Sequence, residues 1–294
     1  MTQSSSDFEA FMERAWNEHA DAPQAVAERL SASIHLIESS AQVAPYARLV
    51  THLFGEHLGQ WERGVDMLGV LRGLPATAGD ASAAAALTRS AAALRYAGGA
   101  TDALAALPAD DRVSALATAA SALAGRNDFR GALGAYDQAL DLAEAGLSAQ
   151  SPAIRALAVG GNNLAAALEE KPERDDVESR GMVRAAEAAL TYWKQAGTWL
   201  EEERAEYRLT QSLLQAGDAA AAVRSAQRCV DVCIANDAPA FELFFARAAL
   251  ALARRAVGDA DGYEISRAEA LALFERVPES ERTWCESELR KLDE

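Results

Sequence analysis

The sequence predicts an all-α fold, a right-handed α-solenoid built from about seven antiparallel helix pairs. The first observation behind this prediction is periodicity, because apolar residues recur at helical spacing and strand-like alternation is absent. The second is composition: 50% of the residues are hydrophobic but only 6% are aromatic, so alanine and leucine carry the apolar content. Both residues favour helix. The third is the interruption of the helical pattern by turn signals at intervals of roughly 30 to 45 residues.

Glycine, asparagine, aspartate and proline mark the ends of the expected helices. These turn signals lie at residues 57–61, 96–101, 125–129, 170–176, 215–219 and 256–260. Their spacing is typical of a chain in which each unit is a helical hairpin. We expect three parts: irregular helical hairpins at residues 1–75, helical repeats at 76–278 and a capping helix at 279–294.

One stretch shows the design of a hairpin in detail. In "LLQAGDAAAAVRSAQRCVDVC", Gly217 and Asp218 form a turn in which glycine accepts a left-handed backbone and aspartate caps the next helix. Ala222, Ala226 and Cys229 then follow at four- and three-residue spacing, which places them on one helix face. Small residues on that face predict a close approach between the two helices of the pair.

Residues 114–143 repeat this arrangement. Ala119 and Ala120 stand where a small residue is needed on the first helix, and Asn127–Asp128 supply the turn. With these features, the chain resembles the tetratricopeptide repeat (TPR) family over roughly residues 80 to 275, and its second half is similar to the longer-period bacterial form. The resemblance implies a superhelix in which the first helix of each pair lines a concave face.

The charge balance narrows the classes of partner. Lysine and arginine number 28 against 44 acids, which gives a net charge of −16. A field of this sign repels phosphate backbones, so nucleic-acid binding by bulk charge is excluded. The N-terminus lacks the pattern of a signal peptide, and the most apolar stretch, residues 241–258, is broken by arginines and too short to span a bilayer. We therefore expect a soluble cytoplasmic protein that binds neither nucleic acid nor membrane.

Histidine and cysteine offer little sign of a metal site in the sequence. His52 and His57 are five residues apart, about 140° around an α-helix, so they are expected to diverge. Cys229 and Cys233 share a helix face, but no third ligand lies near them in the sequence, so they are expected to be small packing residues. The sequence predicts no metal and no cofactor.

Two pairs of acids admit a catalytic interpretation. Asp110–Asp111 and Asp175–Asp176 could hold magnesium in an all-helical enzyme, but each pair follows a proline and precedes a periodic helix. Capping and first-turn acids belong at such positions, because they satisfy free amides and complement the helix dipole. We favour capping, and the sequence predicts no catalytic residue.

What remains is a surface on the expected concave face. The resemblance places a set of polar residues there: Arg89, Arg95, Tyr96, Asn162, Asn163, Arg204, Tyr207, Arg208 and Gln211. Arginine suits carboxylates, and asparagine can bond both donors and acceptors of an extended backbone. The alternative is that the arginines merely pair with neighbouring acids such as Glu202, Glu203 and Glu206.

These features predict a non-catalytic scaffold for protein–protein interaction that binds a peptide segment or partner protein in its concave groove. An acidic segment or a C-terminal carboxylate would suit the arginines. A peptide- or ligand-sensing regulatory module is the alternative, and an all-helical enzyme ranks third. Exposed apolar ends of such arrays often self-associate, which makes a homodimer a further option.

Overall fold

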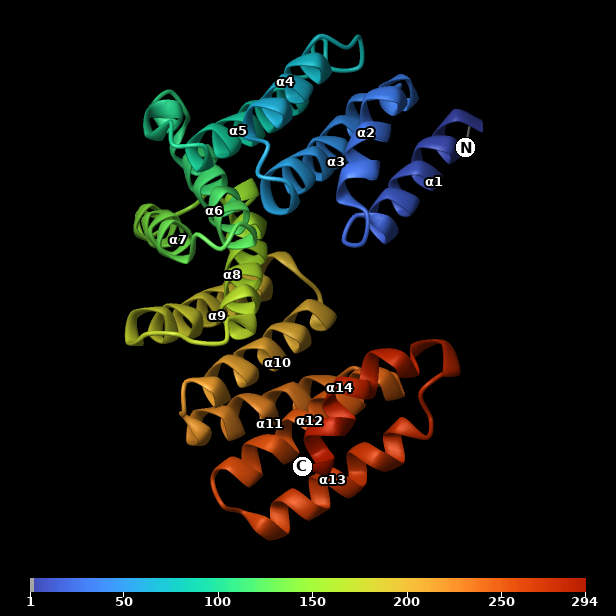
Figure 1. Ribbon diagram of the computed structural model, residues 1–294, viewed down its shortest axis with the longest axis vertical. Helices are drawn as coiled ribbons and strands as arrows, with labels where there is room; N and C mark the ends of the chain where they lie inside the picture. Colours follow the sequence, from blue (N-terminus) through green and yellow to red (C-terminus); the bar gives the residue numbers. More distant parts are fainter. Residues whose placement is uncertain (1–2) are drawn as a thin grey trace. The chain divides into compact units, whose positions relative to one another are not determined.

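The computed structural model describes residues 3–294, and over these residues it contains fourteen α-helices and no strand (Figure 1). The chain divides into two compact units, residues 1–160 (unit 1) and 161–294 (unit 2), and the division falls within one helix. The predicted all-α class, an array of helix pairs, is confirmed. No helix in the described part of the chain combines the length and apolar character needed to cross a membrane.

The helices of unit 1 begin with a less regular set and continue as regular hairpins. They are α1 (Gln3–Glu18), α2 (Pro23–Ser33), η1 (Ile34–Leu36), α3 (Ser40–Thr51), η2 (His52–His57), α4 (Trp61–Arg72), α5 (Ala81–Ala97), η3 (Thr101–Leu104), α6 (Ala109–Gly125) and α7 (Phe129–Ala143), followed by the first part of α8 (Pro152–Glu170). Most are α-helical, η1 and η3 are short 3₁₀ turns, and η2 is a π-helix.

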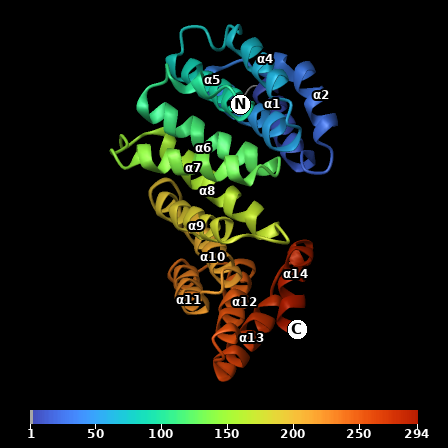
Figure 2. The same ribbon diagram turned by 60° about the vertical axis from the view of Figure 1, so that its left-hand side comes forward.

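The helices of unit 2 follow the second part of α8. They are α9 (Asp176–Ala196), α10 (Trp199–Gln215), α11 (Ala219–Ala235), α12 (Ala240–Ala256), α13 (Ala260–Phe274), η4 (Glu279–Glu281) and α14 (Arg282–Asp293). Consecutive helices pack against each other, as Figure 2 shows for α6 with α7 and for α10 with α11.

The predicted turns have the expected chemistry. Asn127 adopts a left-handed backbone with φ 62°, and the Asp128 carboxylate then accepts a hydrogen bond from the Gly131 amide at 2.9 Å. The same arrangement precedes α11. Gly217 has φ 82°, and the Asp218 carboxylate accepts a hydrogen bond from the amide of residue 221 at 2.9 Å. These two helix pairs therefore close through a left-handed residue followed by an aspartate N-cap.

The acid pairs also occupy helix starts. Asp175 caps α9 in a capping box with Glu178. Asp110 and Asp111 lie in the first turn of α6, where Asp111 pairs with an arginine of α5. The favoured interpretation of these acids as capping and first-turn residues is thus confirmed.

Small residues are buried at the positions where the sequence predicts close contacts between helices. Ala132 on α7 and Ala222, Ala226 and Cys229 on α11 are all completely buried. Burial of such small side chains is what close packing of the paired helices requires.

Replacing Ala132 or Ala222 with leucine should overpack the contact and lower the free energy of unfolding by about 1–3 kcal/mol. Chemical denaturation of each variant measures the effect. Ala235→Leu is the matched control, because Ala235 lies at the exposed end of α11. Loss of stability in the control alone, or in none of the three, would contradict the assignment of the small residues as packing spacers.

The π-helix η2 is held tightly inside unit 1. Its wider turn is visible in the hydrogen bond from the Leu58 amide to the Leu53 carbonyl, five residues back, at 3.0 Å. A Cβ placed on Gly55 would lie 3.1 Å from both Ala122 of α6 and Leu94 of α5. Glycine therefore lets the π-turn press against two neighbouring helices, and this position fixes the direction of the side chains that η2 carries.

Candidate functional site

The predicted concave-face residues of unit 1 lie on α5, and the structure gives them different surroundings. Arg89 forms an ion pair with Asp111 of α6 at 2.9 Å, with both side chains largely buried. Tyr96 accepts a weak hydrogen bond from the side chain of Gln138 on α7 at 3.3 Å. Arg95 is exposed and has no ion pair among the described residues.

Two arginines of α10 are engaged by acids from other helices. Arg208 forms an ion pair with Glu169 of α8, which also accepts a 2.6 Å hydrogen bond from Ser212. Burial raises the pKa of Glu169, an effect that the charge of Arg208 opposes. Arg204 forms an ion pair with Glu242 of α12 at 2.7 Å. These two arginines therefore hold α10 to its neighbours.

The other predicted residues of unit 2 are also partly enclosed. Tyr207 donates a 2.8 Å hydrogen bond to Glu288 of α14, and its pKa is raised well above the usual value, first by burial and then by that carboxylate. Gln211 is buried, and its side-chain nitrogen has no hydrogen-bond partner among the described residues. Asn162 and Asn163 are half-buried on α8.

Glu202, Glu203 and Glu206 do not form the ion pairs expected for them. The expectation that the arginines of α10 pair with these neighbouring acids was therefore wrong. Glu206 binds Arg228 of α11 at 2.8 Å and Ser225 of the same helix at 2.6 Å. Glu202 lies 3.5 Å from Lys194 of α9. Glu203 is buried, and its carboxyl accepts a 3.2 Å hydrogen bond from a cysteine thiol of α11. Pairing does occur, but with acids that sequence proximity does not reveal.

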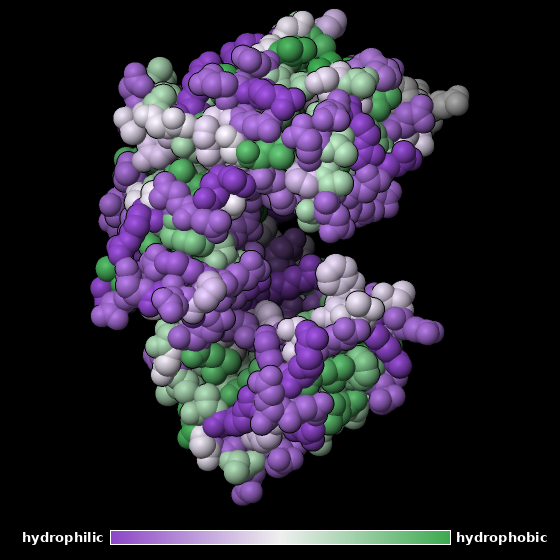
Figure 3. Space-filling view, in the orientation of Figure 1, coloured by the Kyte–Doolittle hydropathy of each residue, from purple (hydrophilic) through white to green (hydrophobic). Residues whose placement is uncertain are grey.

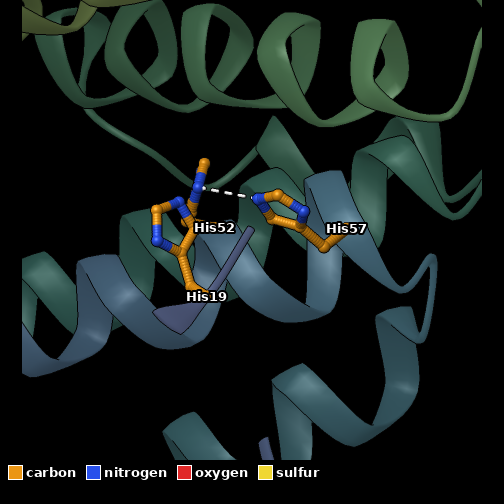
Figure 4. Close-up of side chains that lie close together, drawn as sticks. All are labelled: His19, His52 and His57. Atoms are coloured by element: carbon orange, nitrogen blue, oxygen red, sulfur yellow. Dashed lines mark hydrogen bonds between the residues drawn. The ribbon is translucent and has the colours of Figure 1, made fainter. Parts of the chain in front are cut away.

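The histidines also differ from their expectation, because His52 and His57 converge. The expectation assumed an α-helix, whereas these residues begin and end the π-helix η2, in which five residues make about one full turn. Their Nε2 atoms lie 3.0 Å apart. His19, directly after α1, joins them, and one ring nitrogen from each of the three lies within 4.8 Å of the others (Figure 4).

The histidine cluster, His19, His52 and His57, is half-buried. His52 Nδ1 lies 3.0 Å from the Glu56 carboxylate, which is one turn away on the same helix. The pKa of His57 is lowered, mainly by burial and then by the two other imidazoles. Arg126, the residue directly after α6, donates a 2.8 Å hydrogen bond to the backbone oxygen of His57, which ties η2 to the end of α6.

Unit 1 also carries two surface grooves, one on each side of the end of α5. The larger, of about 660 Å³, lies among α5, η3, α6 and α7 and includes Tyr96. The smaller, of about 330 Å³, lies between α4 and α5 and includes Arg72 and Arg95, so we name it the Arg72–Arg95 groove. It is lined by Val65, Leu68, Gly69, Arg72, Leu87, Thr88, Ala91 and Arg95.

The face of the molecule drawn in Figure 3 is mostly hydrophilic, with apolar residues in separate patches. Val70, adjacent in sequence to the lining residue Gly69, is 53% exposed. Arg72 is not among the site residues that the sequence predicts, because residues 1–75 are expected to form irregular hairpins outside the repeats. Its place in the last turn of an amphipathic helix was the available signal.

Comparisons with known proteins bear on the fold. No family model and no curated protein matches the chain. Among solved structures it is similar to the nearly identical TPR-like repeats of a Podosopora anserina protein assigned as a kinesin light chain, with a TM-score of 0.50, 14% identity and coverage of 80% of this chain and 96% of that one. A variant of the same protein matches with a TM-score of 0.46, 14% identity and coverage of 79% and 93%. At this identity the first likeness shows the fold alone: the chain has the all-α architecture of TPR-like helical repeats.

Proposed function

We propose that the protein is a non-catalytic interaction scaffold and that its Arg72–Arg95 groove binds an acidic peptide segment of a partner protein. The observation that carries the proposal is the composition of this groove: an apolar floor flanked by two exposed arginines, with no acid among its lining residues. Its volume of about 330 Å³ suits a few side chains of an extended segment.

The charges of the groove favour carboxylates. Arg95 forms no ion pair within the described residues, and Arg72 donates a 2.6 Å hydrogen bond to the neutral hydroxyl of Thr88. Both arginines lie in the last turns of their helices, where a cation also complements the helix dipole. That role leaves the guanidinium groups exposed and able to bind carboxylates in bidentate fashion.

The spacing of the two arginines suggests the length of the ligand. Thr88, which contacts Arg72, and Arg95 are two turns apart on α5, about 10 Å along the helix axis. An extended peptide covers this distance with about three residues. We therefore expect a segment with two carboxylates about three residues apart and an apolar side chain between them. One of these carboxylates can be a free C-terminus.

The Arg72–Arg95 groove also has empty space beside Gly69, which a larger side chain at this position would fill. Gly69 lies on α4, and a Cβ placed on it would meet no atom within 4 Å. Leucine at this position should fill the groove without disturbing packing. It should also leave the fold at least as stable, because glycine inside a helix is unfavourable by roughly 0.5–1 kcal/mol relative to alanine.

The experiment measures fluorescence anisotropy of labelled peptides with the acid–apolar–acid pattern and of matched peptides with lysine in place of each acid. We expect the acidic set alone to bind. Arg72→Ala and Arg95→Ala should each weaken binding about 10- to 100-fold, since each removes a charge-assisted hydrogen bond. Gly69→Leu should abolish binding while the protein stays folded by circular dichroism.

Control variants decide where the binding surface lies. Arg224→Ala removes one exposed arginine from unit 2 and should leave the affinity unchanged. Arg204→Ala tests the surface that the sequence favours. Arg204→Ala could instead lose affinity while the Arg72, Arg95 and Gly69 variants bind fully. That result would place the binding site on α10. Equal binding of the acidic and lysine peptides would refute the proposal.

A further inference from the structure

Three imidazoles from two separate segments meet in unit 1, although nothing in the proposed function requires them. His19 follows α1, whereas His52 and His57 belong to η2, and Figure 4 shows the three rings close together. A chain with only four histidines brings three of them together, with one ring nitrogen from each within 4.8 Å of the others.

The hydrogen bonds of the cluster fix the tautomer of two of the rings. His19 Nδ1 lies 2.5 Å from the carbonyl oxygen of Trp16, and His52 Nδ1 lies 3.0 Å from a Glu56 carboxylate oxygen. Each Nδ1 faces an acceptor and therefore carries the proton of the neutral ring. The Nε2 atom then carries the lone pair, as in histidines that bind metals, and in His52 this atom faces His57 Nε2 at 3.0 Å, so a bound ion would replace the hydrogen bond between the two rings.

We propose that His19, His52 and His57 bind a divalent transition metal ion of the Zn²⁺ type through three neutral imidazoles. The ligand set is the three-histidine set of tetrahedral zinc sites, with the fourth position open to water. Glu56 holds the His52 ring in place from behind, as carboxylates do beside metal-binding histidines.

The distances of the cluster are suitable for such an ion. Zinc lies about 2.0–2.1 Å from imidazole nitrogen, so two nitrogens of a tetrahedral site are about 3.3 Å apart. The Nε2 atoms of His52 and His57 lie 3.0 Å apart, and the third histidine is within 4.8 Å. Side-chain rotation of His19, which lies at the end of a helix, can close the remaining distance.

The π-helix provides a rigid base for two of the three ligands. Its backbone is pressed against α6 through Gly55 and is also bonded by Arg126. The third ligand comes from the chain between α1 and α2. A bound ion would therefore fasten α1 to the interior of unit 1, and it would bind the folded state only, since the ligands are far apart in the unfolded chain.

The packing alternative is that the histidines simply fill an aromatic cluster. Trp16 contacts the His19 ring edge-on at 5.1 Å between centroids and the His52 ring at 5.2 Å. Packing of this kind needs no metal, so the two explanations differ in metal binding and in the effect of metal on stability.

The test is titration of metal-stripped full-length protein with Zn²⁺ by calorimetry, followed by absorption spectroscopy with Co²⁺. We expect one ion per chain, a higher melting temperature in zinc, and a cobalt spectrum without the sulfur charge-transfer band of a cysteine site. His19→Ala, His52→Ala and His57→Ala should each lose this binding. His35→Ala is the control, because His35 is exposed and lies outside the cluster.

A conservative variant covers the case in which a histidine variant fails to fold. Glu56→Gln keeps the size of the side chain and all three ligands, and it should weaken zinc binding about 10- to 100-fold without changing the circular dichroism spectrum. Absence of zinc binding by the parent protein, or equal affinity in the three histidine variants and the His35 control, would overturn the proposal.

Discussion

Glu203→Gln should remove most of the pH dependence of stability around α10 and α11 between about pH 4.5 and 8. Glu203 is 1% exposed, and burial is the main reason that its pKa rises from 4.5 to about 8. The nearby Glu242 carboxylate raises this pKa further, whereas the hydrogen bond from Cys229 lowers it. In the folded protein the carboxyl group therefore keeps its proton at pH values at which the unfolded chain has lost it.

The sign of the effect follows from this difference. The folded state binds more protons than the unfolded state between the two pKa values, so the stabilising contribution is complete below about pH 4.5. It is lost as the pH rises through about 8. Each unit of pKa shift corresponds to about 1.4 kcal/mol, so the total loss is on the order of a few kcal/mol.

Urea denaturation of the parent and of Glu203→Gln at several pH values measures this loss, and hydrogen exchange of the α10 and α11 amides locates it. Glutamine resembles the protonated acid, so the variant should be more stable than the parent at pH 8 and about equally stable at pH 5. Glu202→Gln is the control, since Glu202 is on the same helix but partly exposed. Parallel pH profiles for the parent and Glu203→Gln would show that the buried carboxyl group is ionised.

The second large effect is expected at the ion pair between α8 and α10. Arg208→Met should lower the free energy of unfolding by about 3–5 kcal/mol, because it leaves Glu169 buried without its counter-charge. The Glu169 side chain is only 6% exposed, and burial already raises its pKa with the arginine in place. An exposed pair would contribute about 1 kcal/mol or less.

A double-mutant cycle separates the ion pair from the packing of the two side chains. Glu169→Gln removes the buried charge, so Arg208→Met should cost much less in the Glu169→Gln background than in the parent. Chemical denaturation of the four proteins gives the coupling energy. Additive effects of the two substitutions would mean that Glu169 and Arg208 do not depend on each other for stability.

The repeating architecture could be predicted from the sequence because its signals are local. Asp128 and Asp218 each follow a left-handed residue and cap the next helix, and both features depend on neighbouring residues alone. Burial of Ala132 and Ala222 follows from helical spacing within a single segment. Features of this kind are encoded over a few residues, so periodicity and turn chemistry are enough to locate them.

The surroundings of the site residues could not be predicted in the same way, because they depend on contacts between different helices. Arg204 and Arg208 pair with acids that are 38 and 39 residues away along the chain, so the partners could not be chosen by proximity. The histidine cluster was missed for a different reason: the angle between His52 and His57 was derived for an α-helix. Gly55 between them was a local indication of an unusual backbone.

The π-helix also changes the rotational phase of the continuous segment formed by α3 and η2. An α-helix advances about 100° per residue, and a π-turn takes up about one residue more than an α-turn. Side chains at the end of η2 are thus offset by about a quarter turn from the stripe that the periodicity of α3 would give. Tyr46, before the offset, bonds the Leu30 carbonyl of α2, while Gly55, within it, meets Ala122 of α6. The extra residue of the π-turn lets the α3–η2 segment contact α2 with one face and α6 with another. Deleting this residue would rotate one of the two faces away from the helix that it contacts.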